Sequence, residues 1–204
     1  MTASPTSPQI LDLLRERRSP SVFDPTYELS DEQLASLLEA ARWSPSNGNA
    51  QPWAFVVARR GDAAHEVLVG SLSRGNSGWV PPASAVLVTA ARTTPERKPA
   101  LADYARYDLG QAVAHLCVQA ASMGLGVHQF GGFDHEALAA AYEVPDEWSI
   151  VSGIAVGRPW PVRERSGVDP STAERELRER HRKPFSEFAF GSRFGEPLPL
   201  HPHD

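Results

Sequence analysis

Four short polar stretches hold most of the side chains that could bind a ligand. Two are basic: residues 17–19 ("RRS") near the start of the chain and residues 179–184 ("ERHRKP") near its end. The two-pronged guanidinium of arginine matches the geometry of a phosphate, and a serine hydroxyl adds a further donor. Any one of these arginines is more typical of a solvated surface, so the two stretches carry weight only as a pair.

The other two stretches are polar and almost uncharged. They are residues 44–53 ("SPSNGNAQPW") and 74–79 ("RGNSGW"). Their neutral donors and acceptors are mainly Asn47, Asn49, Gln51 and Asn76. Amides of this kind can read the edge of a heterocycle without adding charge. Taken alone, each asparagine is more typical of a turn.

Motifs for other chemistries are absent from the sequence. It has no dinucleotide-binding glycine fingerprint, phosphate loop, zinc-protease motif, cysteine pair or nucleophile elbow. Cys117 lies on the apolar face of the longest expected helix, which favours a buried structural thiol. His201 and His203 offer at most weak, adventitious metal capture. We therefore predict no metal site and no catalytic side chain, which favours a cofactor that carries its own chemistry.

Size and composition limit the function classes. With 204 residues and 41% hydrophobic content, the chain suits one globular domain. A net charge of −5 gives no general reason to bind nucleic acid. No apolar run of ~20 residues predicts a membrane span, and the N-terminal stretch does not resemble a signal peptide. Because Cys117 is the single cysteine, a reducing cytoplasm is the expected location.

The pattern of apolar residues predicts helices and strands in alternation. A first helix is expected to begin at Ser7 and to end near residues 15–19, and Ser30 with Gln33 has the capping-box pattern that opens a second. The remaining elements are expected strands at 53–58, 84–91, 126–130 and 148–157, and helices at 61–72, 102–123 and 134–142. Four strands separated by helices are typical of an α/β fold.

The two ends of the chain differ from this pattern. Residues 1–6 are expected to be disordered. Residues 158–204 are rich in Arg and Pro, as in a tail, yet they include Phe185, Phe188, Phe190 and Phe194. A wholly disordered tail rarely carries four Phe so close together. We therefore expect residues 158–204 to form an extended arm that docks on a surface, such as that of a partner subunit.

Taken together, the stretches resemble the FMN-dependent nitroreductase family. The matching segments are "RRSPSVFD", "SPSNGNAQPWAFVV", Asn76, "GLGVHQFGGFD" and "RHRKP", which cover the chain from about residue 10 to residue 184. The resemblance implies one domain, residues 1–204, built on a central, mostly antiparallel sheet of four to five strands flanked by helices. It also implies a homodimer that exchanges the arm at 158–204 and holds FMN at the subunit interface.

The resemblance also implies a set of FMN-binding residues. The set is Arg17, Arg18, Ser19, Ser21, Pro45, Ser46, Asn47, Asn49, Gln51, Asn76, Gly131, Gly132, Arg180 and Arg182. The basic residues would hold the ribityl-phosphate end, and Asn76 would reach the pyrimidine edge. Backbone N–H groups of the two glycines would face the flavin near N5 and O4. The loop at 45–51 would cover the flavin from the other subunit.

Two positions depart from the family pattern. Ser21 stands where many members carry Lys or Arg near the flavin N1/O2 edge, and Gly131 stands where several carry Glu. A cation there stabilises the reduced flavin by ~1–4 kcal/mol, so its absence should lower the reduction potential unless Arg18 or another base takes over. The short connector at 92–108 leaves the substrate contacts open. Tyr104, Arg106 and Tyr107 are candidates by location alone.

The resemblance implies an enzyme that takes hydride from NADH or NADPH through flavin N5. The acceptors would be nitroaromatics, quinones or related compounds, reduced with ping-pong kinetics. The same fold also hosts dehalogenation, azoline oxidation and flavin destruction, so these chemistries stay open. A flavin-binding protein without turnover is a third alternative, and the missing base at Ser21 favours it slightly.

Overall fold

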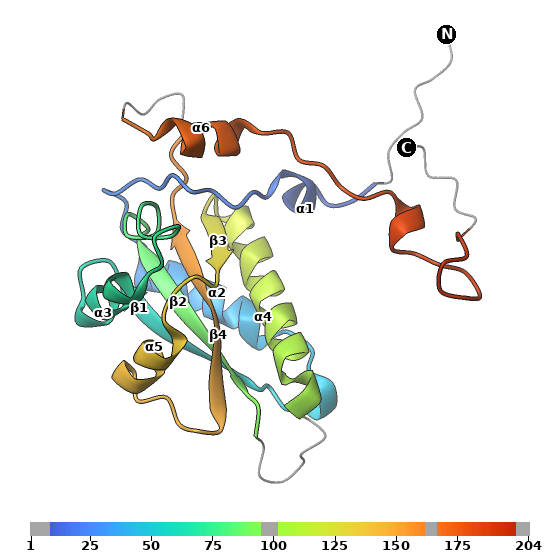
Figure 1. Ribbon diagram of the computed structural model, residues 1–204, viewed down its shortest axis with the longest axis horizontal. Coiled ribbons are helices and arrows are strands. Elements are labelled where there is room, and N and C mark those ends of the chain that lie inside the picture. Colours follow the sequence, from blue (N-terminus) through green and yellow to red (C-terminus); the bar gives the residue numbers. More distant parts are fainter. Residues whose placement is uncertain (1–8, 95–101, 162–166, 199–204) are drawn as a thin grey trace.

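One antiparallel sheet forms the centre of the molecule. The computed structural model describes residues 9–94, 102–161 and 167–198 of the 204-residue chain. The strands are β1 (Trp53–Arg59), β2 (Ala85–Arg92), β3 (Gly126–Phe130) and β4 (Trp148–Gly157). They lie in the order β1-β2-β4-β3 (Figure 1), and every neighbouring pair is antiparallel. The expected α/β fold with a mostly antiparallel sheet is confirmed.

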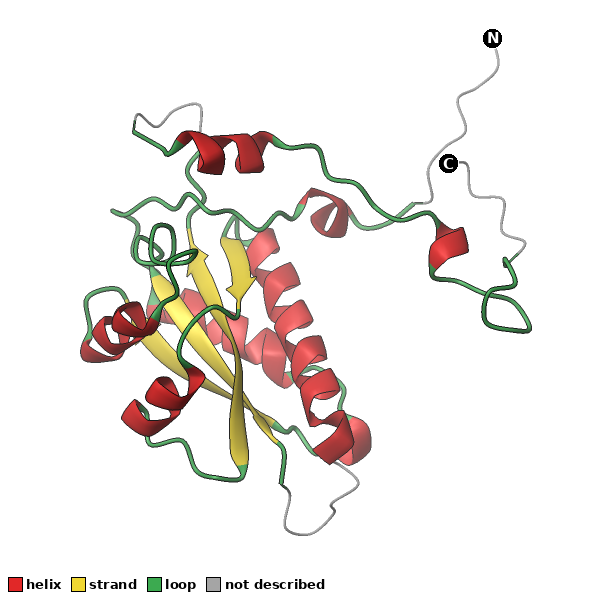
Figure 2. Ribbon diagram, viewed as in Figure 1, coloured by secondary structure: helices red, strands yellow, loops and turns green. Residues whose placement is uncertain are grey.

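Helices cover both faces of this sheet. On one face lie α2 (Asp31–Arg42) and α4 (Ala102–Ser122), and on the other lie α3 (Ala63–Ser71) and α5 (His135–Ala141) (Figures 1 and 2). Each face has its own apolar cluster, one around Leu116 and one around Phe133. All of β2 except its last residue is buried, which explains why it reads as a continuous apolar run.

Local signals explain where α2 begins and where α4 ends. The Ser30 side chain accepts a hydrogen bond from the Gln33 backbone, and the Gln33 side chain accepts one from the Ser30 backbone, so the predicted capping box is confirmed. Gly124 follows α4 with φ +69°, a conformation that favours glycine. The chain can therefore turn directly from α4 into β3, which brings the "GLGVHQFGG" segment to the edge of the sheet.

The first helix is shorter than predicted. It is α1 (Asp12–Glu16), begins after Leu11, and has no buried residue. With only partial packing against α4 to support it, good helix propensity alone does not extend it. Several predictions concern residues outside the described ranges: disorder at 1–6, the cap at Ser7, and the histidines His201 and His203.

The C-terminal arm contains a helix that the sequence analysis did not predict. It is α6 (Pro170–Leu177), capped by the Asp169 carboxylate, which accepts the N–H of Thr172. The arm is therefore not extended throughout. After α6 it runs beside the N-terminal segment, and then reaches the short helix η4 (Phe185–Glu187), which lies away from the sheet (Figure 2).

Two further expectations have an outcome in the described ranges. No helix there is both long enough and apolar enough to cross a membrane. Cys117 is buried on α4, and this burial raises the pKa of its thiol. The prediction of a buried structural cysteine is confirmed.

Candidate functional site

A basic cavity joins the two ends of the chain. Six predicted residues line it, and they are Arg17, Arg18, Ser19, Ser21, Arg180 and Arg182. Its volume is about 320 Å³, and it is also lined by Arg175, Arg178, His128, Glu176 and Glu179, so that six arginines face two carboxylates. We call it the arginine cavity. Guanidinium groups and serine hydroxyls are the donors that a phosphate monoester requires. The donor set therefore fits the phosphate end of FMN.

The arginines of this cavity have different roles. The guanidinium of Arg180 donates to the backbone oxygens of Arg15 and Arg17, at 2.6 Å each, and so ties the arm to the N-terminal segment. Arg182 donates only to the oxygen of its neighbour His181, at 2.9 Å, among the contacts of the described residues. Arg182 thus has donors to spare for a ligand, as do Arg17 and Arg18 with one recorded hydrogen bond each, whereas Arg180 positions Arg17.

Like charges crowd the cavity. Desolvation, and then the positive charges of Arg18, Arg182 and Arg17, lower the pKa of Arg180. A bound dianion would relieve this repulsion and satisfy the unused donors. The electrostatics therefore favour an anionic ligand in the arginine cavity.

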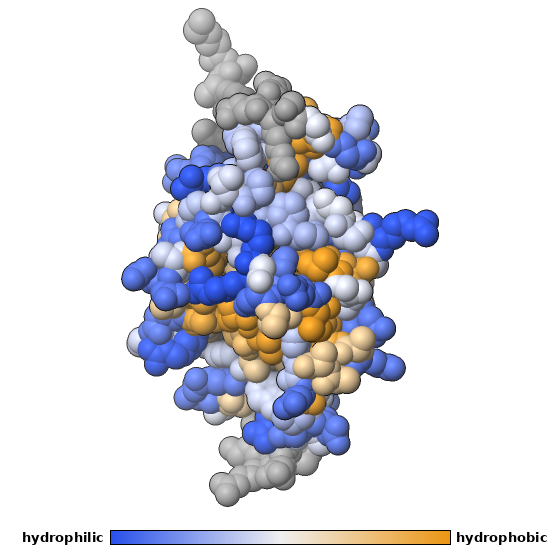
Figure 3. Space-filling model, turned by 90° about the vertical axis from the view of Figure 1, so that its left-hand side faces the viewer, coloured by the Kyte–Doolittle hydropathy of each residue, from blue (hydrophilic) through white to orange (hydrophobic). Residues whose placement is uncertain are grey.

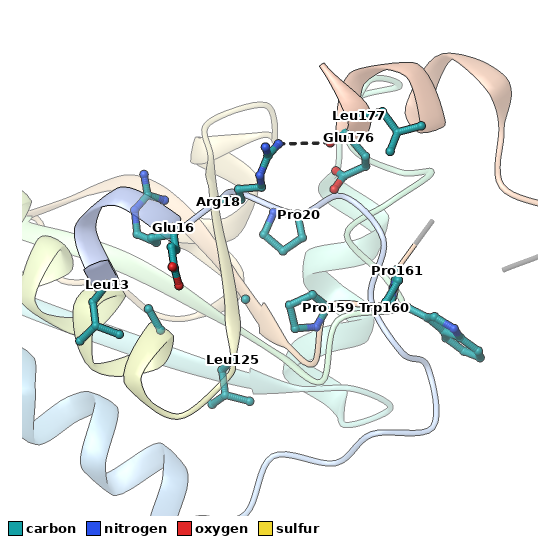
Figure 4. A pocket seen from close by; sticks show the side chains of 13 residues that line it. Leu13, Glu16, Arg18, Pro20, Leu125, Pro159, Trp160, Pro161, Glu176 and Leu177 are labelled. Carbon is teal, nitrogen blue, oxygen red and sulfur yellow. Dashed lines mark hydrogen bonds between the residues drawn. The ribbon is translucent and has the colours of Figure 1, made fainter. Parts of the chain in front are cut away.

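A second cavity shares a wall with the first. Its volume is about 510 Å³, and Arg17, Arg18 and Glu176 belong to both linings. The rest of its wall is largely apolar, with Leu13 and Pro159 among the side chains drawn in Figure 4. An apolar wall offers no donors to a phosphate. The arginine cavity, with more guanidinium groups, therefore suits a phosphate better than this larger groove does.

A row of contacts leads from the arginine cavity to the turn formed by Gly131 and Gly132, which we call the glycine turn. We call these contacts the Ser21–Gly132 row. Ser21 Oγ lies 3.3 Å from Nδ1 of His128, whose ring stacks on Trp79 with centroids 4.1 Å apart. Trp79 Nε1 donates to Asn76 Oδ1 at 3.1 Å, and Asn76 Nδ2 donates to the oxygen of Gly132 at 2.9 Å. The structure thus brings three predicted site residues into one connected set.

The Asn76 amide keeps capacity for a ligand. An amide side chain has two N–H donors and two acceptor lone pairs, and the contacts with Gly132 and Trp79 use one of each. The remaining donor and acceptor suit the edge of a heterocycle. The predicted role of Asn76 is thus compatible with its structural one.

The glycine turn is held by its carbonyl groups. The oxygen of Gly131 lies 3.2 Å from Nε2 of His135, and that of Gly132 also accepts the N–H of Ser73 at 2.9 Å. A Cβ at Gly132 would lie 2.5 Å from Ser73 Oγ, whereas one at Gly131 would meet nothing within 4 Å. Because the carbonyls face internal partners, the turn can offer its N–H groups to a ligand, and the space over Gly131 is open.

The loop at 44–51 is built by its own polar groups. Ser46 Oγ accepts the N–H of Gln51 at 3.0 Å, and Gln51 Nε2 donates to Asn49 Oδ1 at 3.2 Å. Asn49 and Gln51 have positive φ angles of 53° and 48°, which asparagine tolerates better than most residues. The buried carboxylate of Asp108 accepts the N–H of Asn47 at 3.0 Å. Part of the unusual polarity of this stretch is therefore explained by the loop itself.

Within one chain, this loop and the arginine cavity lie apart. Asn47 is fixed to Asp108 in the first half of α4, whereas Ala121, near the end of α4, lines the groove beside the arginine cavity. At 1.5 Å per helical residue, Asp108 and Ala121 are about 20 Å apart along the axis. A single chain therefore does not gather all the predicted site residues around one ligand.

Four residues that contribute to these sites were not predicted. They are Trp79, His128, Asp108 and Glu176. Their contacts join distant parts of the chain, so sequence spacing gives no signal for them. The sequence did carry one signal for Asp108, because a carboxylate stands there at a position on the buried face of α4 that should be apolar. Tyr104 and Tyr107, predicted by location, are 50% and 67% exposed.

Comparison with known proteins agrees with this fold. The model of the Nitroreductase family matches residues 14–158. A solved structure described as an oxidoreductase containing FMN is 30% identical, with a TM-score of 0.85 over 96% of this chain and all of that one. An uncharacterised 15.4 kDa protein of Mycolicibacterium smegmatis is 38% identical over 71% of this chain and 99% of its own length.

Two relatives have named activities. An oxygen-insensitive NADPH nitroreductase of Helicobacter acinonychis is 40% identical, over 37% of this chain and 35% of its own. A 5,6-dimethylbenzimidazole synthase of Rhodospirillum rubrum is 28% identical, over 67% of this chain and 74% of its own. The family match covers both the arginine residues at 17–18 and the glycine turn at 131–132. This chain belongs to the nitroreductase family.

Proposed function

We propose that this protein is an FMN-dependent NAD(P)H oxidoreductase that reduces nitroaromatics, quinones or related acceptors. The observation that carries the proposal is the arginine cavity, where the basic stretches from both ends of the chain meet. Bound FMN would supply the redox chemistry, taking hydride from NADH or NADPH and passing it to the acceptor. The protein then has to bind, orient and tune the cofactor, and needs no nucleophile of its own.

The residues around the cavity divide this work. Arg182 has free donors for the phosphate, and Arg17 and Arg18 line the same cavity. Asn76 offers its unused amide donor and acceptor to the ring edge, and the open turn at Gly131 offers backbone N–H groups. The arginines thus lie at one end of the Ser21–Gly132 row, and Asn76 and the glycine turn lie at the other.

We also propose a homodimer in which the loop at 44–51 of one chain completes the site of the other. The separation of Asp108 from Ala121 along α4 supports this, because one chain cannot bring the loop to its own arginine cavity. Large apolar side chains are also exposed, among them Leu11, Trp43, Tyr107, Phe188 and Phe194. The side of the molecule on which α3 lies presents further apolar surface between hydrophilic groups (Figure 3). Exposed apolar patches are typical of interaction surfaces.

Anaerobic reduction of the purified protein tests the proposal. The protein should be yellow, release FMN on denaturation, and lose its flavin absorbance when NADH or NADPH is added. A panel of nitroaromatics and quinones should then restore the absorbance. A protein that stays colourless and takes up no FMN when it is supplied would contradict the proposal. Light scattering during gel filtration should give twice the 22.2 kDa mass of the chain.

A second function keeps the cofactor and changes the chemistry. The relative named 5,6-dimethylbenzimidazole synthase favours this alternative. The chemistries of this second function are dehalogenation, azoline oxidation and flavin destruction. Normal FMN binding with poor reduction by both nicotinamides would favour it over the main proposal. A purely flavin-binding protein would also show no product with any of these substrates.

A further inference from the structure

His128 makes two contacts through one nitrogen. Its Nδ1 lies 3.0 Å from the backbone oxygen of Pro20 and 3.3 Å from the side-chain oxygen of Ser21. A carbonyl oxygen can only accept a hydrogen bond, so the shorter contact requires a proton on Nδ1. Both the neutral ring in this tautomer and the doubly protonated ring meet this requirement. The proton on Nδ1 is therefore fixed by the geometry.

This tautomer decides what the Ser21 hydroxyl can do. An Nδ1 that carries a proton cannot accept from Ser21, so at this contact the Ser21 oxygen is the acceptor. The Ser21 backbone N–H already donates to the carboxylate of Glu176 at 2.5 Å. Among the described residues, no recorded acceptor remains for the hydroxyl proton of Ser21. Because Ser21 lines the arginine cavity, that proton is available to a ligand there.

The surroundings hold this arrangement firmly. Ser21 is only 4% exposed, and the His128 ring stacks on Trp79 at an interplanar angle of 22°. Burial lowers the pKa of His128, although the hydrogen bond to Pro20 acts in the opposite direction. Trp79 is held in turn by Asn76. The orientation of the Ser21 hydroxyl thus depends on a side chain 107 positions away.

We propose that His128 is a positioning residue that makes Ser21 a hydrogen-bond donor to an acceptor oxygen of the bound flavin. The inference rests on the proposed FMN function. Ser21 lies between the arginines that suit a phosphate and the Asn76–Gly132 end of the row. The acceptor is accordingly a ribityl oxygen or a carbonyl oxygen of the ring. A neutral, fixed donor thus occupies the place where the family pattern has a cation.

The test compares FMN affinity across Ser21→Ala, His128→Phe, His128→Asn and the double variant Ser21→Ala/His128→Phe. The loss of one neutral hydrogen bond should weaken FMN binding roughly three- to tenfold in each of the first two. His128→Asn should restore most of the affinity, because the Asn amide N–H can take the place of Nδ1–H. The double variant should bind FMN no more weakly than Ser21→Ala, since His128 acts through Ser21.

Midpoint potentials identify the acceptor. A lower potential of bound FMN in Ser21→Ala indicates a ring carbonyl, and an unchanged potential with weaker binding indicates a ribityl oxygen; either supports the inference. Wild-type affinity in Ser21→Ala, or a full additional loss from His128→Phe in the Ser21→Ala background, would overturn it. If His128→Phe does not fold, His128→Leu takes its place, alone and in the Ser21→Ala background. A wild-type protein that binds no FMN would instead refute the proposed function, and this inference with it.

Discussion

The buried carboxylate of Asp108 accepts a hydrogen bond from the backbone N–H of Asn47, at 3.0 Å and across 61 positions of sequence. This contact fixes the polar loop at 44–51 to the first half of α4, because Asp108 is only 2% exposed and cannot follow the loop into solvent. The loop is thus held in place before any ligand arrives.

Replacement of Asp108 by alanine should release the loop. The N–H of Asn47 would lose its acceptor, at a cost of about 1–3 kcal/mol in the free energy of unfolding. Urea denaturation measures this cost, and FMN retention during gel filtration reports on the loop. Asp146→Ala, which removes an exposed carboxylate, serves as the control. Equal free energies of unfolding in the two variants would show that the Asp108 contact does not stabilise the fold.

Arg182→Ala should weaken FMN binding far more than riboflavin binding. Charge-assisted hydrogen bonds to phosphate contribute about 1.5–3 kcal/mol, so a roughly 10- to 100-fold loss is expected for FMN alone. Arg180→Ala should weaken both ligands, because it releases the backbone of Arg15 and Arg17. Fluorescence titration with the two flavins measures these effects. Arg193→Ala, at an exposed ion pair with Glu196, is the matched control and should change neither affinity.

The two neighbouring glycines should respond oppositely to a methyl group. Gly132→Ala would place a Cβ 2.5 Å from Ser73 Oγ and 2.6 Å from Asn76 Nδ2, which forces the Asn76–Gly132 contact apart. Overpacking of this kind costs about 1–3 kcal/mol. Gly131→Ala meets nothing within 4 Å and should keep its wild-type melting temperature. Thermal melts of both variants without ligand settle this prediction, which fails if the two behave alike.

Asn49→Gly is a better probe of the loop than a bulky replacement. Asn49 has φ 53°, so a leucine there would strain the backbone, whereas glycine adopts this conformation freely. If the amide contacts the flavin, Asn49→Gly should lower FMN affinity roughly three- to tenfold at unchanged stability. Unchanged flavin content in Asn49→Gly would show that this side chain serves the loop alone.

Stability should decline in mildly acidic solution. Desolvation is the main cause that lowers the pKa of both His65 and His128. The unfolded chain therefore binds these protons more readily, and the free energy of unfolding falls as the pH drops below about 6.5. The decline ends once the pH has passed the folded-state values, and each histidine contributes at most about 1.4 kcal/mol per pH unit.

Urea midpoints between about pH 8 and about pH 5 measure this dependence. His65→Gln should flatten the curve, because it removes one of the two rings whose pKa is lowered by desolvation. His115→Gln, at an exposed position of α4, is the control. A curve of equal steepness in His65→Gln and the wild-type protein would exclude His65 as a contributor.

The elements that pack on the sheet were predictable from local signals. The expected strands 126–130 and 148–157 match β3 and β4 residue for residue, because apolar residues and flanking turn residues mark both of their ends. The two α-helices that have no buried residue were not predictable in this way. Hydrophobic residues at 10–14 suggested a longer α1, but none of the residues of α1 is buried. The polar sequence of α6 gave no apolar period to recognise, although Asp169 and Pro170 form a recognisable helix start.

The site itself was predictable only in part. Arginines near both chain ends, with a serine beside the first pair, suggested a phosphate, and the structure places them around one cavity. The links through His128 and Trp79 could not be read from spacing, because each depends on tertiary packing between distant segments. The division of roles between Arg180 and Arg182 also required the structure, since only their partners distinguish them.

Because α4 separates Asp108 from Ala121, each complete site of the proposed homodimer contains residues of both chains. Dilution that separates the subunits then also opens both sites, so cofactor retention depends on protein concentration. Two differently damaged chains can complement each other for the same reason. A chain without Arg182 paired with a chain without Asn49 forms one site that carries both defects and one site that carries neither.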